Sequence, residues 1–224
     1  LKINILDNYI KSNFLIKQNQ VILTDLNFRN NKLTLNLKSN IFFNPFFEIQ
    51  SNIKIIKINE DIFNTFSIEK IFLHKDVLKR LNSRNEIIWV NKKKFNKYIN
   101  NLYLDVNLAN GMILFTKELF FLDGKTNCLG ESLLTEDYPR LIFNCNFKIN
   151  NTKNFLKNFD ISNKSDINKH NLVISSSLNL LNKKINFDSI IINQKRLNNE
   201  DLIFIKKMFE DILLNETLVK MFSI

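Results

Sequence analysis

The side chains able to carry out chemistry are few in this sequence of 224 residues, and they lie far apart. His74 and His170 are its two histidines, and neither has a Cys or a second His at the spacing of a zinc site. Gly111, Gly124 and Gly130 belong to no phosphate-binding motif, and no Gly-x-Ser-x-Gly nucleophile motif occurs. The sequence therefore predicts no catalytic, cofactor-binding or metal site, and we expect that the protein is not an enzyme.

Cys128 and Cys145 are the one pair of side chains whose spacing has a specific chemical consequence. If residues 125–133 and 140–149 form a hairpin, its symmetric register sets the two cysteines opposite each other and sets small residues against large ones. A disulfide could form there in an oxidising compartment. Small buried apolar side chains explain the two cysteines equally well.

The net charge of +10 raises nucleic acid as a partner. Nearly all of this charge comes from Lys, in a chain rich in Asn, Ile and Phe, which is the composition of an AT-rich genome. The one dense cluster is Lys92, Lys93 and Lys94, between Trp89 and Phe95. A solvated strand end explains this cluster, and a patch for nucleic acid or an anionic membrane is the alternative. We expect no specific nucleic-acid partner.

Alternation of apolar and polar residues is the dominant pattern, and it is typical of strands with one apolar face. In 32–38, Leu33, Leu35 and Leu37 alternate with polar residues, and 21–28 can pair with this segment across the turn-forming residues 29–31.

The same design recurs in the middle of the chain. In 101–108, Leu102, Leu104 and Val106 point to one face, and Asn110-Gly111 then supplies a two-residue hairpin turn before 112–115. Further strands are predicted at 47–58, 86–90, 118–122, 125–133, 140–149, 171–177 and 189–193, with another hairpin over 178–186 that turns at Asn182-Lys183.

These segments predict a mainly β fold, an antiparallel meandering sheet that is curved or groove-shaped, since parallel pairing would require long crossovers. Short helices are expected at 74–81 and 152–159, and 160–169 is a polar link expected to form a mobile loop. We assign 1–197 to the sheet region and 198–224 to a C-terminal helix that docks on it.

The C-terminal helix has clear start signals. Asn198 or Asn199 can cap it, and Glu200 and Asp201 suit the positive end of the helix dipole. An apolar stripe follows, made of Leu202, Ile205, Met208 or Phe209, and Ile212. The stripe predicts a helix that covers the sheet, with insertion into a membrane interface or a partner's groove as the alternatives.

From about residue 101 onward the order of features resembles the C-terminal region of the AsmA-like family. The residues that carry this resemblance are Leu-x-Leu-x-Val-x-Leu at 102–108, Asn-Gly-Met-Ile at 110–113, Tyr-Pro-Arg-Leu at 138–141, Phe-Leu-Lys-Asn-Phe at 155–159 and the strand at 185–193. The resemblance implies a non-enzymatic protein of the bacterial envelope that serves lipid transport and outer-membrane biogenesis. It also implies a periplasmic location, with a tether to the inner membrane through an N-terminal helix that this sequence lacks.

The resemblance further implies a groove-shaped sheet whose apolar face contacts phospholipid acyl chains. On this hypothesis the lipid-facing residues are Leu33, Leu35, Leu37, Leu102, Leu104, Val106, Leu141, Phe143 and Phe147. Burying each large side chain is worth roughly 1.5 to 3 kcal/mol, so such a strip must be covered by protein or by ligand. The alternatives are a structural or adhesive envelope protein with a closed sandwich core, and a basic module that binds nucleic acid through lysines gathered on one face.

Overall fold

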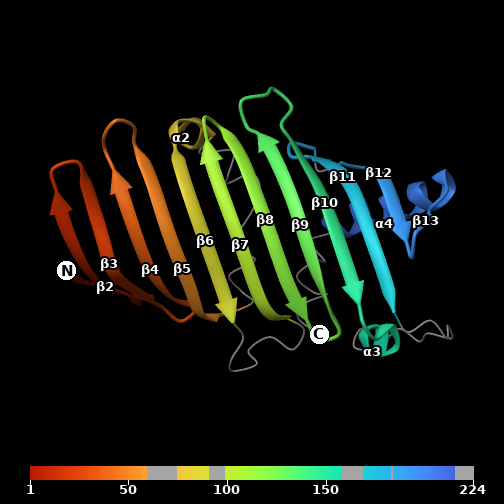
Figure 1. The fold of residues 1–224 in the computed structure, drawn as a ribbon, viewed down its shortest axis with the longest axis horizontal. Helices are drawn as coiled ribbons and strands as arrows, with labels where there is room; N and C mark the ends of the chain where they lie inside the picture. The colour runs from red at the N-terminus through yellow and green to blue at the C-terminus, as the bar shows by residue number, and fades with distance from the viewer. Residues whose placement is uncertain (60–74, 91–98, 158–168, 183, 215–224) are drawn as a thin grey trace.

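The computed structural model describes residues 1–59, 75–90, 99–157, 169–182 and 184–214. Within these residues the chain forms one open, curved sheet of thirteen strands and three helices (Figure 1). The strands are β1 (Lys2–Ile5), β2 (Asn8–Lys17), β3 (Gln20–Arg29), β4 (Leu33–Phe42), β5 (Glu48–Ile58), β6 (Asn82–Val90), β7 (Ile99–Ala109), β8 (Met112–Phe121), β9 (Gly124–Leu133), β10 (Arg140–Ile149), β11 (His170–Asn179), β12 (Ile185–Ile192) and β13 (Lys195–Arg196). The helices are α2 (Lys75–Arg80), α3 (Thr152–Lys157) and α4 (Asn199–Leu214). The predicted fold class is confirmed.

The strands lie in the sheet in the order in which they occur along the chain. Short turns explain this order. Asn110 and Gly111 have φ angles of 51° and 79°, the left-handed pair that a two-residue hairpin requires, so the predicted turn between β7 and β8 is confirmed. Between β3 and β4, Oδ1 of Asn30 accepts hydrogen bonds from the backbone N–H groups of Lys32 and Leu33.

One strand pair departs from the predicted antiparallel meander. β5 and β6 are parallel, with Glu48 beside Asn82 and Ile55 beside Trp89. The prediction was wrong here because it overlooked the length of the connection from Ile58 to Asn82, which is long enough to cross from one end of the sheet to the other. α2 belongs to this connection, and it occupies all but the ends of the helix predicted at 74–81.

Other differences concern the ends and the continuity of strands. β8 runs unbroken from Met112 to Phe121, whereas the sequence pattern predicted two separate strands at 112–115 and 118–122. β1, β2 and β13 were not predicted. β11 and β12 form a second hairpin over the predicted segment, but Leu178 pairs with Ile185, which centres the turn one residue before the predicted Asn182-Lys183. Lys183 itself lies outside the described residues. The polar link at 160–169 lies, except for its last residue, outside the described residues, as does the Lys92–Lys94 cluster.

α4 follows its start signals. Asn198 caps the helix, since its Oδ1 accepts a hydrogen bond of 2.8 Å from the backbone N–H of Asp201. α4 lies against β12, and Leu202 and Ile205 are half-buried while Ile203 and Phe204 are 68% and 65% exposed. α4 thus contacts the sheet at β12, and the docking of 198–224 as a whole stays a prediction. The side chains of Met208, Phe209 and Ile212 lie outside the described part.

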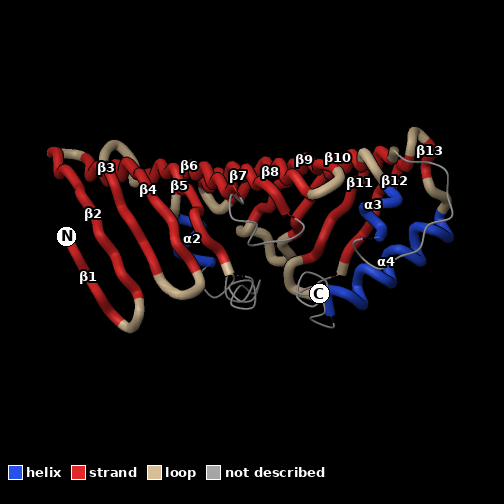
Figure 2. Tube along the Cα trace, turned by 90° about the horizontal axis from the view of Figure 1, so that it is seen from below, coloured by secondary structure: helices blue, strands red, loops and turns tan. Residues whose placement is uncertain are grey.

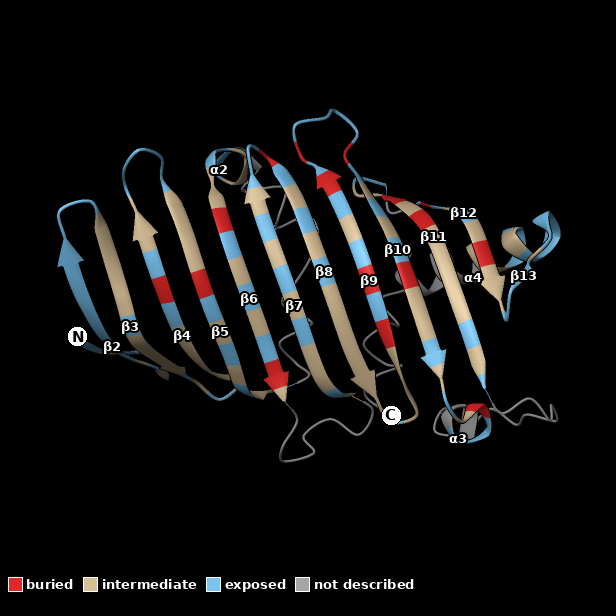
Figure 3. Ribbon diagram, viewed as in Figure 1, coloured by how far each residue is buried: buried red, intermediate tan, exposed pale blue. Residues whose placement is uncertain are grey.

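The three described helices lie on the same side of the sheet, toward which the N-terminal strands bend (Figure 2). Along the central strands, exposed residues alternate with less exposed ones, so one face of the sheet is more exposed to solvent than the other (Figure 3). In β7, for example, Tyr103, Asp105 and Asn107 are exposed, and Leu104 and Val106 between them are half-buried.

Candidate functional site

The register of the sheet gathers large apolar side chains on one face. Residues that stand directly opposite each other on paired strands point to the same face, so each set of partners can be followed from strand to strand. We call the surface that carries Leu37, Leu104 and Phe143 the apolar face, and the other surface the polar face. All nine residues predicted to contact lipid lie on the apolar face, which the paired registers from β3 to β12 make continuous.

Three neighbouring rows of partners cross the apolar face from β4 to β12. The central row consists of Leu37, Ile53, Ile87, Leu104, Lys117, Cys128, Cys145, Ile174 and Ile190. With adjacent strands about 4.8 Å apart, it spans about 38 Å. One flanking row consists of Leu35, Ile55, Trp89, Leu102, Leu119, Thr126, Phe147, Leu172 and Ile192. The other runs from Ser39 and Ser51 through Asn85 to Val106, Phe115, Gly130, Phe143, Ser176 and Phe187.

The apolar face is not sealed like the interior of a β-sandwich. Among the described residues, the buried apolar side chains are Trp89, Cys128, Leu134, Pro139, Cys145, Leu178, Ile185 and Ile190. Leu37, Ile53, Leu104 and Phe143 lie in the middle of their strands and are of intermediate exposure, neither fully buried nor exposed. No second sheet packs on the first within the described part of the chain. The described residues therefore cover this long apolar surface only in part.

Among the described residues, α4 covers the β12 end of the apolar face. Ile185 and Ile190 are 1% and 2% exposed, and α4 lies against their strand (Figure 2). The connection into α4 is fixed there, because the backbone N–H of Leu197 donates a hydrogen bond to the carbonyl of Ile190. At the other end β2 keeps Phe14 and Ile16 at 47% and 70% exposure. The two ends of the apolar face thus differ in exposure.

Gly130 makes room for a ring on the apolar face. A Cβ atom at this position would meet Cε1 and Cζ of Phe115, so only a residue without a side chain allows the Phe115 ring to lie over the strand. Phe143 stands opposite Gly130 on the other neighbouring strand. The two phenyl groups flank a position where the backbone itself forms the floor.

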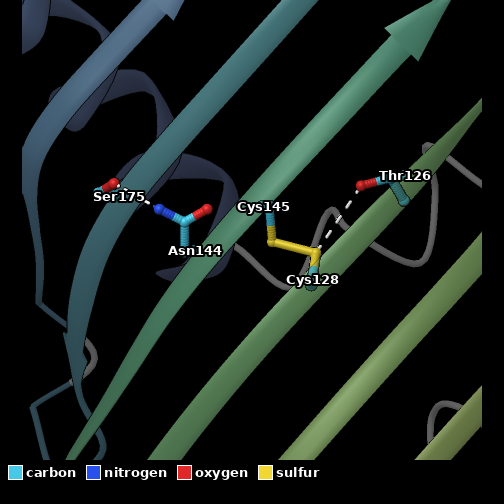
Figure 4. The surroundings of a disulfide bond; sticks show 5 residues. All are labelled: Thr126, Cys128, Asn144, Cys145 and Ser175. Atoms are coloured by element: carbon cyan, nitrogen blue, oxygen red, sulfur yellow. Dashed lines mark hydrogen bonds between the residues drawn. A yellow bond between two sulfur atoms is a disulfide. The ribbon is translucent and has the colours of Figure 1, made fainter.

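Cys128 and Cys145 stand opposite each other in the predicted register, and the structure joins them by a disulfide (Figure 4). Their Cα atoms are 4.1 Å apart. The Thr126 hydroxyl lies 3.7 Å from the Cys128 sulfur, and both residues are buried. The bridge lies in the central row and links β9 to β10 in the middle of the apolar face.

The polar face carries charges of both signs. Lys125 forms an ion pair of 3.5 Å with Glu118, and Arg84 forms one of 3.3 Å with Glu48. A hollow of about 540 Å³ over β7 to β12 is lined mainly by side chains of this face, including Glu131. Such mixed charge does not favour the nucleic-acid alternative, which requires a predominantly basic surface.

Lys117 is the residue of this site that sequence reasoning missed. It lies in the central row between Leu104 and Cys128, and burial lowers the pKa of its ammonium group because a charge loses hydration there. The signal was present in the sequence, since Lys117 interrupts the alternation of Ile113, Phe115, Leu119 and Phe121.

Other kinds of site receive no support from the described residues. No group of three or more His, Cys, Asp or Glu side chains in them could hold a metal ion. Nδ1 of His170 is 2.6 Å from the Thr152 hydroxyl, so this imidazole ties β11 to α3. None of the described helices combines the length and the apolar character needed to cross a bilayer.

No protein-family model, curated protein or solved structure matches this chain. The similarity to the AsmA-like family therefore stays a hypothesis that rests on the residues given above.

Proposed function

We propose that this protein is a non-enzymatic lipid-binding protein, whose apolar face holds the acyl chains of phospholipids. The observation that carries the proposal is the set of three parallel rows, about 38 Å long, whose large side chains stay partly exposed on an open sheet. Transfer of apolar surface out of water is worth roughly 25 cal/mol per Å², so such a surface gains from an apolar occupant. Acyl chains are long and flexible, and they fit a surface that is continuous across many strands.

The proposal extends to the setting that the AsmA-like resemblance implies. A groove of this kind would carry phospholipids between membranes in the periplasm, in support of outer-membrane biogenesis, with the protein tethered to the inner membrane. The disulfide between Cys128 and Cys145 supports an oxidising compartment. A structural or interaction protein of the envelope is the second candidate, because another protein chain could cover the same rows.

Site-specific photo-crosslinking in cells tests the proposal. A crosslinker placed at Leu104 or Phe143 is expected to capture phospholipid. The matched control is Ile142, which is next to Phe143 on the same strand but points to the polar face and is 50% exposed. A crosslinker at Ile142 is expected to capture little or no lipid.

Charge substitution provides a second arm of the test. Leu104→Asp and Phe143→Asp are expected to abolish lipid capture by a crosslinker elsewhere in the rows while the chain still folds, because the altered side chains are half-buried and can reach water. Ile142→Asp is expected to leave capture unchanged. If the Leu104 and Phe143 crosslinkers capture only protein, and the Asp variants unfold, the rows form a closed interface and the lipid proposal is wrong.

A further inference from the structure

Lys117 has a position that the proposed function does not explain. In the central row it is the one charged residue among nine, with Leu104 and Cys128 directly opposite it and with Phe115 and Leu119 as its neighbours on the same face of β8. Its neighbours in sequence, Thr116 and Glu118, point to the polar face, so a lysine at either of their positions would lie among polar side chains.

Lys117 has no anionic partner in the described part of the chain. It forms no ion pair or hydrogen bond there. The apolar face of β5 to β10 carries no Asp or Glu, because the acidic residues of these strands, such as Glu86, Asp105 and Glu131, all point to the polar face. The ammonium group is thus matched by no charge on its own surface.

The side chain also cannot reach the rim of the sheet. Lys117 is the sixth residue of β8, and Phe121 at the nearer end lies about 14 Å away along the strand, farther than a lysine side chain extends. In an empty groove water can hydrate the ammonium group. Once acyl chains fill the rows, water is displaced, and burial already lowers the pKa of this group. An occupied groove therefore requires an anion at this point.

We propose that Lys117 binds the phosphate of an anionic phospholipid whose acyl chains lie along the rows. This inference rests on the proposed function and adds to it a preference for lipids with a net negative head group over zwitterionic ones. A lone ammonium group neutralises the single charge of the phosphodiester in an anionic lipid, whereas in a zwitterionic lipid the cation of the head group already balances that charge. A charge-assisted hydrogen bond in a poorly hydrated site gives a preference of roughly tenfold.

The test uses two photoactivatable lipids with identical acyl chains, one with a phosphatidylglycerol head group and one with a phosphatidylcholine head group. They are offered separately to the purified chain in vesicles that are otherwise the same. The wild type is expected to capture the phosphatidylglycerol probe roughly tenfold better. Lys117→Met is expected to bring the two yields together, and Lys117→Arg is expected to restore the preference.

Lys148→Met is the matched control, because Lys148 is exposed on the polar face of β10 and its loss lowers the net charge by the same amount. This variant is expected to keep the preference. If Lys148→Met removes it as fully as Lys117→Met does, the preference reflects overall charge and the Lys117 site is wrong.

The remaining outcomes separate this inference from the proposed function. Equal capture of both probes by the wild type and by Lys117→Met overturns the head-group site and leaves the acyl-binding face in place. Failure to capture either probe overturns both. Circular dichroism checks that Lys117→Met folds. If it does not fold, Lys117→Gln removes the same charge with a polar side chain and is expected to lose the preference in the same way.

Discussion

Removal of the Cys128–Cys145 bridge is expected to destabilise the chain by about 3 kcal/mol. The bridge closes a loop with a sequence separation of 17 residues. The chain-entropy relation gives about 3 kcal/mol at 25 °C for a loop of this length, through the freedom that the unfolded chain regains. This value is an upper figure, since residual pairing of β9 with β10 in the unfolded chain would already restrict the loop.

The variant to use is Cys128→Ala together with Cys145→Ala. In the fold, β9 and β10 pair through nine register positions and pair with β8 and β11 on their outer sides, so the hairpin keeps its neighbours without the bridge. Urea unfolding can be followed by the fluorescence of Trp89, the single tryptophan, which is 3% exposed and changes environment when the sheet opens. Circular dichroism on the same samples checks that the whole sheet unfolds in the same transition.

Unfolding in the presence of reductant distinguishes the effect of losing the disulfide from the effect of replacing the two cysteines by Ala. Wild type in reductant is expected to unfold at the urea concentration of the double variant, and the double variant should not respond to reductant. Equal midpoints for oxidised wild type and double variant, with free thiols in the wild type by mass measurement, would refute the bridge and leave the cysteines as small buried side chains.

Three further outcomes follow from single side chains. Gly111→Ala is expected to destabilise by about 1 to 2 kcal/mol in urea unfolding, because φ is 79° and the new Cβ would lie 2.9 Å from Cγ2 of Thr135. Asn198→Ala is expected to weaken α4 by about 1 kcal/mol, seen as faster hydrogen exchange at the Asp201 amide. Lys117→Met is expected to be more stable than wild type at neutral pH. Because the pKa of Lys117 is lowered in the fold, wild-type stability should rise with pH from the folded pKa up to about 10.5, whereas the variant should lack this rise.

The β7–β8 and β9–β10 hairpins were predictable because the turn residues and the pattern of side chains along the strands indicate the same strand pairing. Residues 125–133 and 140–149 share a mirror-like arrangement of small and large side chains, and the structure pairs Cys128 with Cys145 and Gly130 with Phe143 as that arrangement requires. Asn110-Gly111 fixes the β7–β8 pairing in the same way. In both cases local residues alone determine which strands meet.

The missed elements lack such local information. β2 contains a register shift between Asn13 and Phe14 and then three consecutive apolar residues, so its apolar period breaks in the middle. β1 and β13 have four and two residues, which is too short for any alternation to be recognised. The parallel β5–β6 pair depends on where a long connection crosses the sheet, and the sequence of the two strands does not encode this.

Lys117 explains one wrong strand prediction, and the same residue is central to the proposed binding of anionic lipid. A lysine at an apolar position made β8 look like two short strands, since a charge on the dry side of a strand normally marks its end. The structure shows instead one strand whose charge points to the apolar face. Local rules of this kind fail most often where a residue is kept for a role other than stability.

The same residue distinguishes the readings of the apolar face. In a closed core an ammonium group without a partner would be strongly destabilising, because burial of an unpaired charge is among the most unfavourable changes in a protein. In an open groove it is hydrated while the groove is empty, and it meets a phosphate when an anionic lipid enters. A protein partner would have to place a carboxylate against Lys117, and its capture would be lost in Lys117→Glu through like-charge repulsion. Anionic lipid would be lost from Lys117→Glu as well, but the zwitterionic probe would still be captured through its acyl chains. Capture of the zwitterionic probe by Lys117→Glu is therefore expected for a lipid-binding face and not for a face that binds a protein partner.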